Sequence, residues 1–377
     1  MVGVLQAARG QVGLFPTAPS ANTVLFDQIR ATAALRFSDE KSAIDNAAKA
    51  RTDALDAEGD RVINVKAQIN NAKLAVESGQ EAIANVRTKL LEIRTAVALA
   101  AEPDEDVELR AADFDGVVAV INGEAETGGR AFALVGGIDR NTFEPNTIEY
   151  RKNLGFGVSV LKGTYIGTDW RVEANDGTVW VPDLESDTVT QYSELQGQVQ
   201  KTTLSDGSPF DKTSSLRNGV TLTSYDGTTK AITFEVTFDP EQPPEVVTGT
   251  LKQTGIGLMG SWFYDKLATG VGRKAAFDAI EKAEIELTSK EAQLQLAAGT
   301  VSTDSRKADE EIARLSRSKV EVLTEQLTRT EKLQMTTAQQ IQAMMVNLDN
   351  LSQQQQNYIN AFAGYVHSPF LRLNLQV

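Results

Sequence analysis

The stretch VINVKAQINNAKLAVESGQEAIANVRTKLLEIRTAV, residues 62–97, decides the fold expected of this chain. Apolar or small residues recur through it at alternating steps of three and four without a break. A repeat of this kind over about five heptads predicts one long α-helix with a single apolar seam that packs against another helix. The seam consists of Val62, Val65, Ile69, Ala72, Val76, Gly79, Ile83, Val86, Leu90, Ile93 and Val97.

A second long helix is predicted from about residue 272 toward the C-terminus. Gly299 and Thr300 are expected to interrupt it, because glycine weakens a helix interior. No proline lies between residues 20 and 102 or between residues 245 and 368, which suits two helical arms. The seam predicted for the second arm contains Ile280, Leu287, Leu294 and, beyond the interruption, Ile341, Met345, Leu348, Ile359 and Phe362.

Between the arms the pattern changes to short β-branched runs separated by Gly, Asn, Asp and Pro. Five such runs, at 117–121, 156–161, 179–181, 220–223 and 231–238, are predicted to be strands. Asp176-Gly177 and Asp226-Gly227 predict hairpins with type I′ turns, since both residue types tolerate positive φ.

The expected fold is therefore α+β: a long antiparallel helical bundle or coiled coil, formed by the N- and C-terminal arms, with an inserted antiparallel β-rich domain. The predicted boundaries are 1–102 for the first arm, 103–260 for the inserted domain and 261–377 for the second arm. Residues 1–20 are expected to become ordered only on assembly.

Composition excludes several classes of protein. The chain has no Cys and one His, so thiolate metal sites, cysteine nucleophiles and histidine pairs cannot occur in it. No apolar run approaches the roughly 18 residues of a membrane-spanning helix. A net charge of -14 argues against a nucleic-acid partner. His367 beside Ser368 lacks a third catalytic group, so no enzyme site and no cofactor or metal is predicted.

Two local motifs have more than one interpretation. Gly255, Gly257 and Gly260 match the spacing of a dinucleotide-binding turn, but no returning strand follows, so a flexible connector between strand and helix is preferred. The acidic residues of 104–108 could bind Ca²⁺. We prefer a capping or solvated role, because acidic groups also stabilise the N-terminus of a following helix.

Charge is divided unevenly along the chain. Residues 101–260 hold 12 Lys and Arg against 26 Asp and Glu, which leaves 25 basic and 25 acidic residues for the arms. Neutral arms can pack against copies of themselves without accumulating repulsion, whereas a uniformly acidic segment stays solvated. We therefore expect packed arms and an outward-facing middle.

Three segments resemble bacterial flagellins. AVESGQEAIANVRTKLLEIRTAVALAAEPDEDVELRAADFDGVVAVING (75–123) is similar to the second half of the flagellin N-terminal conserved region. AAFDAIEKAEIELTSKEAQL (275–294) and LTEQLTRTEKLQMTTAQQIQAMMV (323–346) are similar to the two C-terminal flagellin helices. The Ser-Gly, Arg-Ile-Asn and Asp-Asp string of the first flagellin helix has no counterpart between residues 35 and 65, so no receptor-binding or chaperone-binding residue is carried over.

The resemblance implies a non-catalytic structural subunit of an extracellular helical filament, exported without a cleaved Sec signal. Its main partner would be further copies of itself, with an export chaperone and cap or junction proteins as other partners, and it would neither bind nucleic acid nor insert into a membrane. Apolar residues near the two ends would form terminal contacts, namely Phe15, Phe370, Leu371, Leu373 and Leu375. Alternatives are a hook–filament junction or cap component, a phage or virus tail or fibre protein, and a secreted adhesin that presents its β domain.

Overall fold

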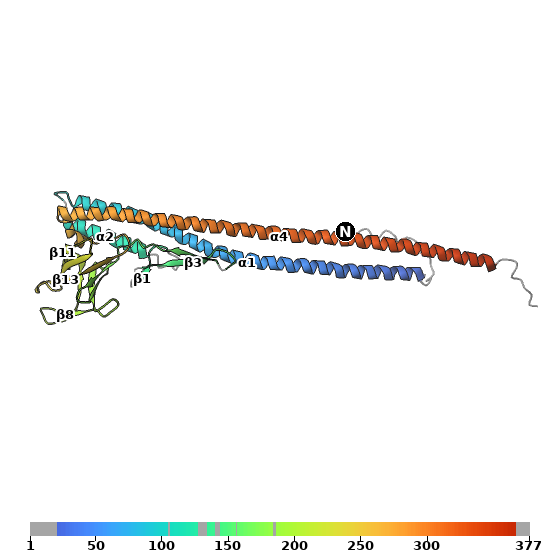
Figure 1. Ribbon diagram of the computed structural model, residues 1–377, viewed down its shortest axis with the longest axis horizontal. Helices are drawn as coiled ribbons and strands as arrows, with labels where there is room; N and C mark the ends of the chain where they lie inside the picture. Colours follow the sequence, from blue (N-terminus) through green and yellow to red (C-terminus); the bar gives the residue numbers. More distant parts are fainter. Residues whose placement is uncertain are drawn as a thin grey trace, which may run out of the picture. The chain divides into compact units, whose positions relative to one another are not determined.

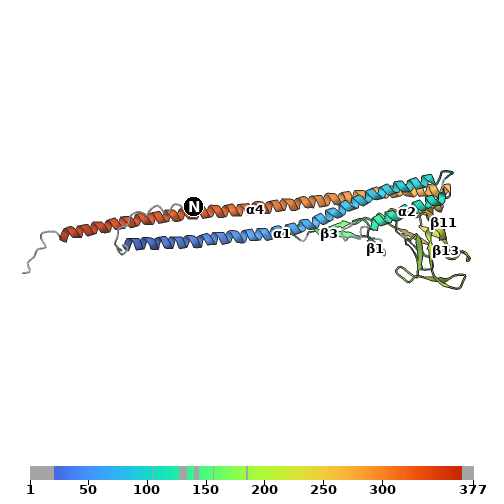
Figure 2. The same ribbon diagram turned by 180° about the vertical axis from the view of Figure 1, so that it is seen from behind.

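The chain folds into a mixture of helix and sheet, with a long C-terminal helix and a curled antiparallel sheet (Figures 1 and 2). The computed structural model describes residues 21–104, 106–126, 134–139, 144–155, 157–183 and 186–366. These residues form two compact units. The two-helix unit contains 21–59 and 313–366, and the mixed unit contains the described residues of 60–312.

Two helices, α1 (Ala21–Leu99) and α4 (Gly270–Val366), contribute to both units. Within the mixed unit they run antiparallel, because residue numbers rise on α1 as those of their ion-pair partners fall on α4. Lys66 pairs with Asp309, and Arg87 Nη2 lies 2.8 Å from Glu291 Oε2.

The interruption expected at Gly299 and Thr300 is wrong, since α4 is continuous there. One glycine costs a helix only about 1 kcal/mol relative to alanine. Leu294 and Val301, each 1% exposed, flank this point on the buried face, so packing offsets the cost.

Seven strands form the main antiparallel sheet, in the order β10-β7-β6-β5-β13-β12-β11. Three two-stranded sheets, β1-β2, β3-β4 and β8-β9, complete the described β structure. The strand bounds are β1 Ile138–Asp139, β2 Glu144–Pro145, β3 Thr147–Arg151, β4 Val158–Lys162, β5 Trp170–Ala174, β6 Val179–Asp183, β7 Thr188–Tyr192, β8 Lys201–Thr203, β9 Pro209–Asp211, β10 Thr213–Ser215, β11 Val220–Tyr225, β12 Ala231–Val236 and β13 Glu245–Gln253.

The run at 117–121, predicted to be a strand, belongs instead to helix α2 (Val107–Glu126). Ala111, Phe114, Val118 and Ile121 are all buried, at steps of three and four. This helical period began before residue 117 and outweighed the β propensity of the short Val and Ile run. Asp106 Oδ1 accepts hydrogen bonds from the backbone N–H groups of residues 108 and 109, so part of the acidic cluster caps α2, as preferred from the sequence.

Both predicted hairpins are present, but neither has a type I′ turn. Strands β5 and β6 pair across Asp176-Gly177, where only Gly177 has positive φ, at 88°. Strands β11 and β12 pair across residues 226–230, and the positive φ falls on Lys230, at 63°. The Asp226 carboxylate accepts from the Thr228 N–H, which stabilises this longer loop.

The segment that joins β13 to α4 is buried rather than flexible. Ile256, Leu258 and Met259 are no more than 3% exposed, and Gly255 and Gly257 supply the positive φ values that their turns require. The 3₁₀ segment η2 (Ser261–Leu267) follows it, and the short helix α3 (Leu216–Gly219) packs against η2. The largest buried aromatic side chains of the mixed unit are Trp170, Trp180 and Trp262, each at most 3% exposed.

Two helical glycines offer a matched test of this packing. An added Cβ at Gly299 meets nothing within 4 Å, whereas at Gly79 it would lie 2.8 Å from Val135 Cγ2 and 3.0 Å from Leu294 Cδ1. Gly299→Ala should therefore raise the free energy of unfolding by roughly 0.4–1 kcal/mol. Gly79→Ala should lower it, because overpacking costs about 1–3 kcal/mol. Urea unfolding followed by circular dichroism measures both, and equal stabilisation by the two variants would contradict the close packing at Gly79.

Candidate assembly surfaces

The seam predicted on α1 is already covered within one chain. Val62, Val65, Ile69, Val76, Ile83, Val86, Leu90, Ile93 and Val97 are at most 6% exposed, as are Ile280, Leu287 and Leu294 on α4. These side chains form the core of the mixed unit between the two helices and the segments packed on them. They are consequently not free to contact another molecule.

The two-helix unit has far less buried apolar surface. Among its described side chains, the buried apolar ones are Ala48, Leu315 and Val322. Ion pairs join its helices instead: Arg51 Nη1 lies 2.7 Å from Glu325 Oε2, and Lys319 Nζ lies 2.7 Å from Asp56 Oδ1. Exposed ion pairs of this kind contribute only about 0–1 kcal/mol each. They fix the antiparallel register but supply little of the stability.

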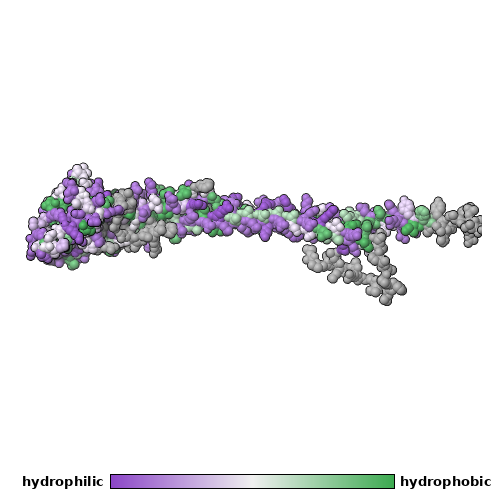
Figure 3. All heavy atoms as spheres, turned by 90° about the horizontal axis from the view of Figure 1, so that it is seen from below, coloured by the Kyte–Doolittle hydropathy of each residue, from purple (hydrophilic) through white to green (hydrophobic). Residues whose placement is uncertain are grey.

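Large apolar side chains remain exposed on both helices of this unit. Of the predicted seam, Ile341 and Leu348 are half-buried, whereas Met345, Ile359 and Phe362 are 36%, 63% and 72% exposed. Other exposed apolar side chains here are Leu25, Leu35, Leu327, Met335, Leu351 and Tyr358. On the face drawn in Figure 3, apolar groups interrupt the polar surface of the helices. The predicted terminal contacts Phe15, Phe370, Leu371, Leu373 and Leu375 lie outside the described residues.

A groove between the helices of the two-helix unit continues this apolar surface. It has a volume of about 390 Å³, and its apolar lining comes from both helices. Leu25, Ile29 and Phe37 contribute from α1, and Leu333 and Met344 contribute from α4. The groove therefore leaves apolar surface of both helices uncovered.

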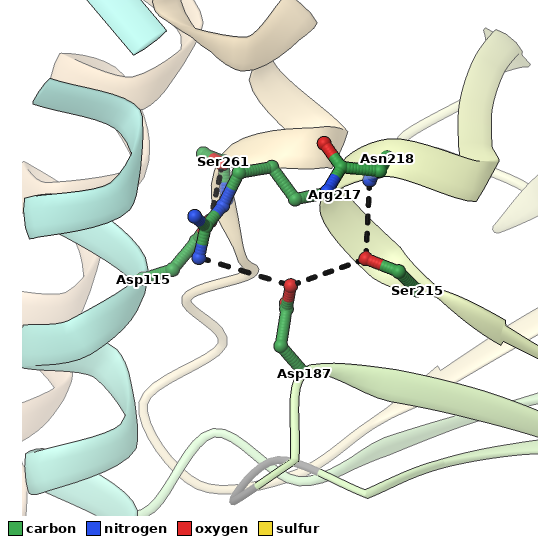
Figure 4. A network of polar contacts seen from close by, with 6 residues as sticks. All are labelled: Asp115, Asp187, Ser215, Arg217, Asn218 and Ser261. Atoms are coloured by element: carbon green, nitrogen blue, oxygen red, sulfur yellow. Dashed lines mark hydrogen bonds and ion pairs between the residues drawn. The ribbon is translucent and has the colours of Figure 1, made fainter. Parts of the chain in front are cut away.

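In the mixed unit, a polar cluster fixes α2 against the sheet and against the entry to α4 (Figure 4). Asp115 on α2 accepts from the Ser261 N–H and from the Ser261 hydroxyl, both at 2.6 Å. Its Oδ2 also accepts from Arg217 Nε at 3.0 Å. Asp187 lies 3.8 Å from Arg217 Nη2, and burial followed by the nearby charge of Asp115 raises the pKa of the Asp187 carboxyl. The cluster therefore joins four segments that are distant in sequence.

A second polar contact joins the β3–β4 hairpin to α4. Tyr150 Oη on β3 donates to Asp304 Oδ2 on α4 at 2.9 Å, and Ser159 Oγ on β4 donates to the same oxygen at 3.3 Å. The pKa of the Tyr150 hydroxyl is raised to about 12, chiefly by burial and in part by the Asp304 carboxylate, while the hydrogen bond with Ser159 opposes the shift. No local sequence pattern indicates this contact, because Asp304 is separated from both Tyr150 and Ser159 by 145 residues or more.

Neither a metal nor a membrane site is found in the described part of the chain. No three His, Cys, Asp or Glu side chains of these residues group closely enough to hold a metal ion. None of the described helices has a segment apolar and long enough to cross a bilayer. His367 lies outside the described residues.

No protein-family model and no curated protein sequence matches the chain.

The raised pKa of Tyr150 predicts a loss of stability at alkaline pH. Between about pH 10 and 12 the unfolded chain loses this phenolic proton while the folded chain retains it, so the free energy of unfolding falls as pH rises. Tyr150→Phe should flatten part of that decline in chemical unfolding measured from pH 8 to 12. Tyr358→Phe is the control, because Tyr358 is 69% exposed. An alkaline decline of the same slope in Tyr150→Phe and wild type would contradict the assignment.

Proposed function

We propose that this protein is a non-catalytic structural subunit of an extracellular, flagellin-like filament built from copies of the same chain. The observation that carries the proposal is the exposed apolar surface of the two-helix unit, which includes Leu351, Ile359 and Phe362 at 57% to 72% exposure. Single exposed apolar residues are normal on soluble proteins. A series of them along two neighbouring helices, together with an open groove, is typical of an assembly contact.

The charge distribution supports other copies as the occupant of that surface. The arms outside residues 101–260 hold equal numbers of basic and acidic residues, so copies can pack side by side without net repulsion. Burial of apolar area stabilises such packing by about 25 cal/mol per Å². Under this proposal the copies cover the face that a single chain leaves open.

The mixed unit suits a solvated position in the filament. Residues 101–260 carry a net charge of -14, and such segments repel one another when brought close. The proposal therefore places the sheet on the outside of the filament, in the helix–sheet–helix arrangement of flagellins. Export without a cleaved signal, and contacts with a chaperone and with cap or junction proteins, belong to the same proposal.

Assembly should depend on the exposed apolar side chains of α4. Replacing Leu351, Ile359 and Phe362 together by Gln keeps good helix formers on the helix but removes the apolar surface. We expect the variant to form at least tenfold less sedimentable polymer than wild type, with an unchanged far-ultraviolet circular dichroism spectrum.

The matched control replaces Val246 and Phe210, which are 62% and 36% exposed on strands of the mixed unit, by Gln. This control should polymerise like wild type. Electron microscopy of the concentrated protein distinguishes the alternatives. Long unbranched filaments support the proposal, defined trimers indicate a fibre protein, and persistent monomers that bind a surface ligand indicate an adhesin. Wild-type polymer yield from the triple variant would overturn the proposed contact.

A further inference from the structure

A cavity of about 550 Å³ lies in the mixed unit, where the turn of the β3–β4 hairpin stands beside α1 and α4. Apolar groups from α1, Val62 and Val65, line one side. Polar groups line the rest, with Lys152 and Asn153 from the hairpin turn and Asp304 from α4 among them. The volume falls in the range of about 300–1,000 Å³ that is usual for small-molecule sites.

Asp304 is a charged side chain that is only 5% exposed and has one unused oxygen. Its Oδ2 accepts from Tyr150 and Ser159. Its Oδ1 has no hydrogen-bond partner among the described residues, and it is not one of the buried atoms sealed from solvent without a partner. Since Asp304 lines the cavity, this oxygen is open to a hydrogen-bond donor that enters it.

Two ammonium groups accompany this carboxylate. Lys152 and Lys307 both line the cavity, and neither forms an ion pair with any residue that the structure describes. Elsewhere in the mixed unit, lysines such as Lys66, Lys212 and Lys290 pair with carboxylates of the same chain. The cavity thus presents two lysines that form no ion pair with the described residues, together with the carboxylates of Asp304 and Glu311.

We propose that this cavity binds a small carboxylate that also carries a hydrogen-bond donor, which is the shared chemistry of sugar acids and free amino acids. The donor, a hydroxyl or an ammonium group, occupies Asp304 Oδ1, and the carboxylate of the ligand lies between Lys152 and Lys307. Val62 and Val65 contact the carbon skeleton. A metal ion fits poorly, because among the described residues no acidic cluster with metal-ligand spacing exists at the site.

The test uses the full-length, unpolymerised protein, so its outcome is separate from that of the assembly proposal. Isothermal titration and ligand-detected NMR measure the binding of two probes, glucuronate and alanine. Glucose and alanine methyl ester lack the carboxylate and serve as the ligand controls. Saturable binding of either carboxylate, at least tenfold tighter than that of its control, supports the proposal and identifies the source of the ligand. No saturable binding of either probe overturns it.

Two variants locate the binding in the cavity. Asp304→Asn keeps an oxygen that can accept from Tyr150 but replaces the free acceptor by an amide N–H₂ group, so the dissociation constant should rise at least tenfold. Lys152→Ala/Lys307→Ala alters only exposed residues, so it preserves folding, and it should weaken binding to the same degree.

Lys274→Ala/Lys282→Ala removes two exposed lysines away from the cavity and should bind like wild type. The cavity lysines should also be protected by the bound ligand against acetylation, as measured by mass spectrometry. Unchanged affinity in the Lys152/Lys307 variant would overturn the site even if a probe binds elsewhere on the protein.

Discussion

The structure of the mixed unit depends on the closed apolar seam between α1 and α4. Leu90 and Ile93 on α1 and Leu287 on α4 are fully buried. The apolar face of each helix is thereby removed from water, which stabilises the pair. The segments that follow are attached to this pair by specific contacts. Val135 packs at Gly79, where a side chain would not fit, and Asp304 holds the β3–β4 hairpin by hydrogen bonds. Without the seam, the helix positions against which Val135 and the β3–β4 hairpin pack would not be fixed.

In the two-helix unit, the same two helices lack a closed apolar seam of this kind. Few apolar side chains are buried there, and exposed ion pairs such as Arg51–Glu325 contribute little. Long helices with few tertiary contacts open locally at low free-energy cost. In the filament that we propose, the mixed unit would keep its core within one chain, and further copies would cover the exposed apolar side chains of the two-helix unit.

The sequence predicted the long helices and their seam because a strict alternation of three and four over many residues has few other solutions. It failed where the signal was short or non-local. The prediction of a strand at the VVAVI run, residues 117–121, is wrong because five residues are too few to show a helical period. The period becomes visible only when the preceding Ala111 and Phe114 are included. The interruption predicted at Gly299 is wrong because the free-energy cost of one glycine in a helix is small compared with the stabilisation from burying side chains such as Val301. The polar groups at Asp115 and Asp304 could not be predicted, since their partners lie more than 100 residues away.

Those two carboxylates also show how differently a buried polar group can be used. Both carboxylate oxygens of Asp115 accept hydrogen bonds, from Ser261 and from Arg217, so this side chain serves to join segments of the fold. Asp304 uses one oxygen for the same purpose, whereas its other oxygen has no partner among the described residues, and the side chain lines a cavity together with Lys152 and Lys307. Because this oxygen is not sealed from solvent, water or a ligand can supply the hydrogen-bond donor that the fold does not. A contact that served only to hold the hairpin would not require Lys152 and Lys307 at the same cavity. The difference between the two oxygens of Asp304, together with these lysines, is the reason why we propose a binding site here.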